Sequence, residues 1–109
     1  MNWLHDLAYL FGGAFLANAV PHFVSGMMGQ PFRSPFAKPS GVGLSSSTVN
    51  FLWGFANFVV AYLLIARVGR FDPRAPDQIA ALAAGVLLFG LFSARHFGRF
   101  HGGNSPTGT

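Results

Sequence analysis

The chain has 109 residues, of which 51% are hydrophobic and only 9% are charged, and its mean hydropathy is +0.43. A soluble domain carries about 25% charged residues, so this composition predicts a protein whose solvent is the lipid bilayer. The absence of cysteine excludes disulfides, thiolate metal sites and cysteine nucleophiles. The net charge of +4 is scattered over short segments, and no basic stripe indicates a nucleic-acid partner.

Three runs of low charge are long enough to cross a bilayer, for which a helix needs about 20 mostly apolar residues. They predict helices over about 4–28, 46–68 and 77–98, all within one membrane domain of residues 1–100. The tail 101–109 is rich in Gly, Ser and Thr and is expected to be disordered. We therefore predict an all-α, three-helix transmembrane protein, built as an antiparallel helical hairpin plus a third helix.

Polar side chains inside the first two runs are informative, because a polar group in hydrocarbon is costly unless it has a partner. Spacings of three and four residues place them on one face of each helix. They are Asn18, His22 and Ser25 in the first run, and Asn50 and Asn57 in the second, where Gly54 and Ala61 share the face as packing residues. At about 1.5 Å per residue, Asn18 and Asn57 reach the same depth in an antiparallel hairpin. We predict that these two asparagines are in contact, and that His22 contacts Asn50 or Trp53.

The segment 29–45 between the first two helices is rich in proline and phenylalanine. It contains a near-repeat in which Pro31-Phe32 is followed by Pro35-Phe36. Prolines fix the backbone, while phenylalanines and the neighbouring basic residues suit the membrane interface. We expect an ordered interfacial loop, and a flexible linker is the alternative.

Residues at the helix ends offer capping groups. The hydroxyls of residues 45–48 can accept hydrogen bonds from the first amides of the second helix. Asp77, which follows Pro76, is expected to cap the third helix in the same way.

The third helix carries small residues at spacings that let helices approach closely. One stripe holds Ala83, Gly90, Ala94 and Gly98, and a second step joins Ala81 to Gly85. Such stripes serve packing within one chain or contact between chains. We favour packing within the chain for Gly90 and Ala94, with contact in an oligomer as the alternative.

No catalytic or metal-binding pattern is present, so we expect no enzyme. The acids Asp6, Asp72 and Asp77 are too dispersed to act as an acid–base pair, and no histidine spacing fits a metal site. His22 beside Pro21 could serve as an axial ligand of haem or chlorophyll. A histidine that simply has a hydrogen-bond partner is the interpretation we favour, and no cofactor is predicted.

The order of motifs between about Leu10 and Leu64 is distinctive. It runs Pro21-His22-Phe23, Gly29-Gln30-Pro31-Phe32, Ser34-Pro35-Phe36-Ala37, Pro39, Gly41, Gly43-Leu44-Ser45-Ser46, Asn50, Trp53-Gly54 and Asn57. In this order the chain resembles a group of small, uncharacterised bacterial integral membrane proteins. The resemblance covers about half of the chain and implies a multi-pass protein of the bacterial inner membrane, without implying a function.

Three functional hypotheses follow. The first is an accessory protein that packs against a larger membrane complex, one version being a photosynthetic or respiratory assembly whose quinone access it influences. The second is a homo-oligomeric channel or transporter lined by Asn18, His22, Asn50 and Asn57. The third is a pigment or haem carrier that uses His22.

Overall fold

The computed structural model describes residues 2–104. Its elements are α1 (Trp3–Met27), β1 (Phe32–Arg33), β2 (Leu44–Ser45), α2 (Ser47–Tyr62), the π-helical turn η1 (Leu63–Val68) and α3 (Pro76–His101). The all-α, three-helix prediction is confirmed, and α1, the continuous helical run Ser47–Val68 and α3 are each long and apolar enough to cross a membrane. The two strands add only one short antiparallel ladder, in which Phe32 pairs with Ser45 and Arg33 with Leu44.

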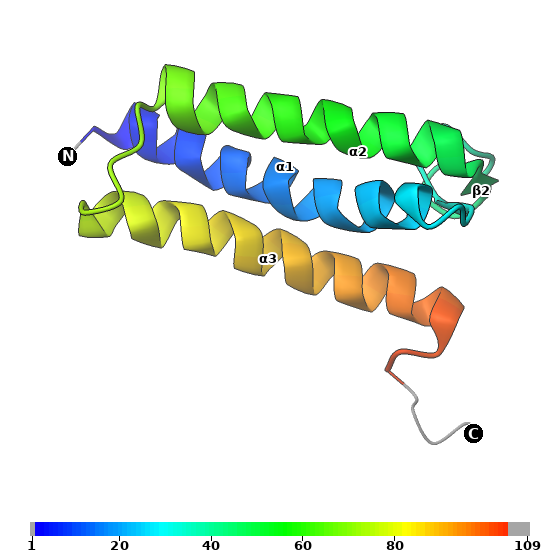
Figure 1. Ribbon diagram of the computed structural model, residues 1–109. Coiled ribbons are helices and arrows are strands. Elements are labelled where there is room, and N and C mark those ends of the chain that lie inside the picture. The colour runs from blue at the N-terminus through cyan, green and yellow to red at the C-terminus, as the bar shows by residue number, and fades with distance from the viewer. Residues whose placement is uncertain (1, 105–109) are drawn as a thin grey trace.

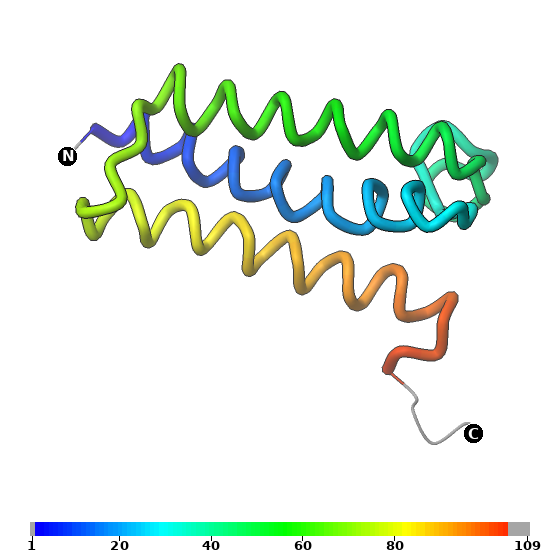
Figure 2. The backbone as a smooth tube through the Cα atoms, in the orientation of Figure 1, coloured from blue at the N-terminus to red at the C-terminus, as the bar shows by residue number. Residues whose placement is uncertain are grey.

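The three helices form one layer with α1 in the middle, flanked by α2 and α3 (Figure 1). α2 runs antiparallel to α1, whereas α3 runs in the same direction as α1, as the tube in Figure 2 makes plain. Of the most apolar stretch of each helix, 33% is buried in α1, 22% in the helix that includes η1, and 6% in α3. α1 is therefore the centre of the fold, and α3 is its most exposed helix.

Glycines set how closely the helices approach α1. A Cβ on Gly54 of α2 would lie 2.5 Å from the backbone nitrogen of Phe23, and one on Gly85 of α3 would lie 2.0 Å from the carbonyl oxygen of Leu10. Only a residue without a side chain permits contacts of this kind between helix backbones. Gly54 is thus a packing residue, as predicted, and Ala61 on the same face is buried.

The small residues of α3 that pack within the chain are not the ones predicted. A Cβ on Gly90 would meet nothing within 4 Å, and Ala94 is exposed. The expectation that these two residues pack within the chain is wrong. α3 is rotated about its axis so that Gly85, which belongs to the second pair of small residues, faces α1. Gly90 and Ala94 remain available on the outer side of α3.

The helix ends agree with the sequence in one case and differ in two. Ser46 caps α2, and its hydroxyl accepts a hydrogen bond from the Val49 amide at 3.2 Å. The capping role predicted for Asp77 is wrong: Ala75 is the N-cap of α3, and Pro76 takes the first helical position, where its missing N–H costs nothing. Asp77 then lies inside the first turn.

At its other end, α3 continues three residues beyond the predicted end, to His101, before Gly102 ends it in a left-handed conformation. A turn follows, closed by the Gly103 amide on the Gly98 carbonyl. Residues 101–104 of the tail predicted to be disordered are thus ordered, and residues 105–109 lie outside the described residues.

Candidate functional site: a histidine beside a groove on α1

Asn50 organises the end of the molecule where the 29–45 segment lies. Its side chain is fully buried, and its Nδ2 lies 3.1 Å from each of three carbonyl oxygens, those of Phe32, Ser45 and Ser46. These acceptors fix the orientation of the amide, because only Nδ2 can donate to them. Asn50 thereby joins both strands of the loop to the first turn of α2.

The remaining oxygen of Asn50 determines the state of His22. Asn50 Oδ1 lies 2.7 Å from His22 Nδ1, and since an amide oxygen only accepts, Nδ1 must carry the hydrogen. In the neutral ring, Nε2 then holds a free lone pair. His22 is 2% exposed, and Nε2 has no hydrogen-bond partner among residues 2–104. The predicted contact from His22 is confirmed, with Asn50 rather than Trp53 as the partner.

Aromatic rings surround His22 edge-on. Phe32 of the loop, Trp53 of α2 and Phe97 of α3 have ring centroids 5.5, 6.5 and 6.1 Å from the imidazole, all close to perpendicular to it. Rings in this arrangement stabilise one another and hold the imidazole in one orientation. The loop, α2 and α3 therefore each contribute one ring to the surroundings of this histidine.

The second predicted contact between the hairpin helices is also confirmed. Asn18 Nδ2 donates to Asn57 Oδ1 at 2.9 Å, and Asn57 Nδ2 donates to the Trp53 carbonyl at 2.8 Å. Ser25 does not join these pairs: its side chain is half-buried and makes no hydrogen bond within the described part of the chain. The polar seam thus consists of two pairs, Asn18–Asn57 and His22–Asn50, with Ser25 outside it.

Two cavities adjoin the seam. The first, here called the His22 cavity, has a volume of about 350 Å³ and lies between the three helices and the loop; its lining includes Asn18, His22, Arg33, Trp53, His96 and Phe97. The second, here called the Phe15 cavity, has a volume of about 250 Å³; it is lined by Phe11, Ala14, Phe15, Asn18, Trp53, Asn57 and Phe89. Because Asn18 and Trp53 line both, the two cavities are neighbours along one side of α1.

The loop is fastened over the His22 cavity from two sides. Ser34 is buried and its hydroxyl lies 2.5 Å from that of Ser45, across the short ladder. On the other side, His96 Nε2 donates to the Gly41 carbonyl at 2.7 Å, while His96 Nδ1 accepts from Arg99 at 2.9 Å. The loop is therefore attached to α3 as well as to α2.

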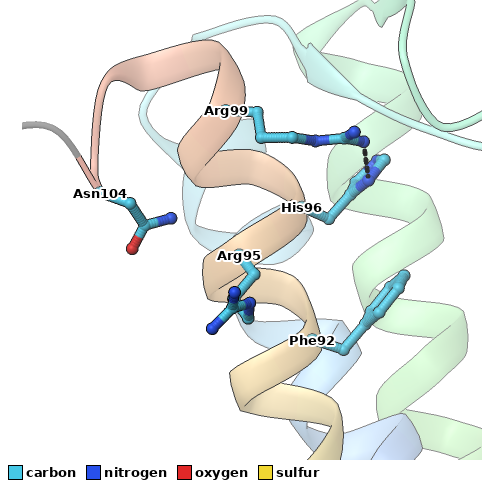
Figure 3. A pocket seen from close by; sticks show the side chains of 5 residues that line it. All are labelled: Phe92, Arg95, His96, Arg99 and Asn104. Atoms are coloured by element: carbon cyan, nitrogen blue, oxygen red, sulfur yellow. Dashed lines mark hydrogen bonds between the residues drawn. The ribbon is translucent and has the colours of Figure 1, made fainter.

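A third, open pocket of about 500 Å³ is lined by α3 and its C-terminal turn (Figure 3). Phe92 and His96 project toward the other helices, and Arg99 reaches across to His96, whereas Arg95 lies over the near face of α3 and Asn104 lies on the side away from His96. His96 and Phe92 stack with centroids 5.7 Å apart and also line the His22 cavity. This third pocket is basic, whereas the His22 cavity has both aromatic and polar side chains in its lining.

Two nitrogen atoms near the inner cavity lack partners. Trp53 Nε1 and Arg33 Nε are buried and make no hydrogen bond within residues 2–104, although both side chains line the His22 cavity. An N–H group buried without a partner costs about 1–3 kcal/mol. The sequence analysis did not propose Arg33, Ser34 or His96 as site residues, although Arg33 and Ser34 lie within the segment 29–45 that it predicted to be an ordered loop.

The four loop residues named from the sequence separate in the structure. Phe32 contacts His22, and Pro35 lines the His22 cavity. Phe36 is exposed and meets Trp53 edge-on at 5.0 Å, and Pro31 is exposed. Within residues 2–104, no group of three or more His, Asp or Glu side chains is placed to hold a metal ion.

Comparison with protein-family models, curated proteins and solved structures finds no match to this chain.

Proposed function

We propose that the protein is a small accessory subunit of a larger complex in the bacterial inner membrane, and that the outer face of α3 binds the partner. The outer face is here the set Ala80, Ala83, Leu87, Gly90 and Ala94. The observation that carries the proposal is the rotation of α3, which turns these residues away from α1.

The outer face has the form of a surface for another helix. Its spacings of three and four residues place small side chains on either side of Leu87, which is 61% exposed. In lipid, helices associate through close packing and not through the hydrophobic effect, so a shallow stripe of small residues favours a helix partner over lipid chains. α3 is also the helix with the least buried apolar stretch, at 6%.

The channel alternative receives less support from the geometry. A pore needs polar side chains that face water, whereas Asn50, Asn57 and His22 are buried and the first two direct their amides to partners in the same chain. A carrier of haem or pigment would have to use His22 Nε2, beside a cavity of about 350 Å³. Both remain as outcomes of the experiment below.

Site-specific photo-crosslinking in native membranes tests the proposal. A photoreactive residue at Leu87 should give one adduct of defined mass with a different membrane protein, identified by mass spectrometry. The same residue at Leu52, an equally exposed position on α2, should give lipid adducts only. Ala94→Leu, which fills the outer face, should abolish the protein adduct, and Ala56→Leu, on the exposed side of α2, should leave it unchanged.

Two results would overturn the proposal. An adduct between two copies of this chain at Leu87 would favour the homo-oligomer, and the absence of any protein adduct would mean that lipid covers the outer face. An absorption spectrum of the purified protein, recorded in the same preparation, reports a bound pigment or haem directly.

A further inference from the structure

A groove runs along α1 between α2 and α3, on the side where the His22 and Phe15 cavities adjoin. Its floor is one stripe of α1, formed by Phe11, Phe15, Asn18 and His22 at helical spacings. We propose that this groove binds a lipid-soluble para-quinol, with the hydroxylated ring in the His22 cavity and an apolar tail in the Phe15 cavity. This inference goes beyond the docking role of α3, whose outer face lies away from the groove.

The hydrogen-bonding groups in the His22 cavity, at the loop end of the groove, match a hydroxyl group. His22 Nε2 can only accept in the neutral ring, because Asn50 holds the hydrogen on Nδ1. Trp53 Nε1–H can only donate, and it has no partner among residues 2–104. A hydroxyl donates one hydrogen bond and accepts others, so the hydroxyl groups of a quinol match both the acceptor on His22 and the donor on Trp53.

The remaining lining combines aromatic rings, against which a quinol ring can pack, with polar side chains. Trp53, Phe92 and Phe97 supply the rings, and Asn18, Ser34, Ser40 and His96 are the polar residues beside them. The one guanidinium that lines it, Arg33, already donates to the Val42 carbonyl at 3.0 Å and lies 4.4 Å from the centre of the Phe100 ring. These contacts hold the guanidinium in place, and its Nε–H, which has no partner within residues 2–104, can donate to a quinol oxygen as well as to an anion.

The Phe15 cavity, at the other end of the groove, has the apolar lining expected of a site for a hydrocarbon tail. Phe11, Ala14, Phe15 and Phe89 line it, together with the two asparagines of the seam and Trp53. At about 1.5 Å per residue, Phe11 lies about 16 Å along α1 from His22, toward the interior of the membrane. A tail that enters the bilayer can therefore lie beside the helix while its ring stays at the loop end.

Equilibrium dialysis of the protein in lipid nanodiscs, with trimethyl-1,4-hydroquinone and trimethyl-1,4-benzoquinone as probes, tests the ring site. The quinol should bind saturably, one per chain, and about five- to tenfold more tightly than the quinone, because a quinone has no hydrogen to donate to His22. His22→Asn keeps an amide donor for Asn50 but removes Nε2. This variant should abolish the preference for the quinol.

A second pair of variants separates the tryptophans. Trp53→Phe should weaken both probes about five- to tenfold, because the indole donates to either kind of oxygen. Trp3→Phe, at the exposed start of α1, should change neither. If His22→Asn fails to fold, the quinol-to-quinone ratio of the unchanged protein and the Trp53→Phe result still decide the matter.

The tail site has its own test. Ala14→Leu fills the Phe15 cavity and should weaken a decyl-substituted quinol while leaving trimethyl-1,4-hydroquinone unaffected. Equal affinities for quinol and quinone, or uptake that does not saturate and is the same in Trp53→Phe, would overturn the proposal and indicate partition into lipid. Neither result bears on the crosslinks at Leu87, so the two proposals fail independently.

Discussion

The two ends of α1 are closed in different ways. At one end Tyr9 is fully buried, its hydroxyl donates to the Gly69 carbonyl, and its ring meets Phe71 edge-on at 5.4 Å. At the other end His22 is almost as buried, but only its Nδ1 has a partner, and Nε2 lies free beside a cavity. At the Tyr9 end the buried polar group has its hydrogen-bond partner, whereas at the His22 end one ring nitrogen can still accept a hydrogen bond.

The lengths of the two connections account for the difference. The short connection 69–75 brings Gly69 directly onto the Tyr9 ring, where a Cβ would lie 2.1 Å from Cε1, so no space is left. The longer segment 29–45 has its own strand pair and is held at its base by Asn50. A loop supported in this way can cover a cavity without collapsing into it.

Replacing Asn50 should destabilise the end of α1 that carries His22 and the loop. Asn50→Leu keeps the number and branching of the side-chain heavy atoms but leaves the carbonyls of Phe32 and Ser45 and the Nδ1 of His22 without their partner. Buried groups left unpaired should lower the free energy of unfolding by about 3 kcal/mol, the largest effect expected of these variants. Thermal unfolding in detergent measures it, and Asn104→Leu, at an exposed position, is the control.

The effect of Asn50→Leu should be confined to the loop end of α1. Protease cleavage should increase within 29–45 and not at the connection 69–75, because only the former depends on this amide. Uniform cleavage at both connections would contradict the idea that the two ends are closed separately.

Tyr9→Phe should affect the closed end by less. The ring and its contact with Phe71 remain, and only the bond from the hydroxyl to the Gly69 carbonyl is lost. We expect a loss of about 1 kcal/mol in the free energy of unfolding, with no change in quinol binding. Tyr62→Phe, whose side chain is 55% exposed, should leave stability unchanged. A loss at Tyr9 as large as that at Asn50 would remove the contrast between the ends.

The hairpin was predictable from the sequence because few quantities decide it. Hydropathy places the spans, and a fixed rise per residue sets the depth of each polar group, so Asn18 has only Asn57 opposite it. In hydrocarbon a polar side chain without a partner is costly, which makes such pairs reliable signals.

The arrangement of α3 was not predictable in this way. Gly85 and Gly90 are both small residues in an apolar helix, and which of them faces α1 depends on the rotation of α3 about its own axis. That rotation follows from packing against Leu10 and from the bond between His96 and the loop, neither of which has a periodic signal. The same rotation decides whether Phe97 reaches His22. The groove beside His22 was therefore not predictable from the sequence either.

The pair between the two ends, Asn18–Asn57, should have the smallest effect, and a double-mutant cycle with Asn18→Ala and Asn57→Ala measures it. Hydrogen bonds between membrane helices contribute only about 0.6 kcal/mol on average, because in the unfolded state within the membrane these amides also find partners. Asn57 supports this expectation, since its Nδ2 already donates to the Trp53 carbonyl of its own helix and would do so without α1. A coupling energy above about 2 kcal/mol would mean that the middle of α1, and not its ends, fixes the hairpin. A value near the average leaves the ends in control, because there the partners are loop carbonyls that no isolated helix can replace.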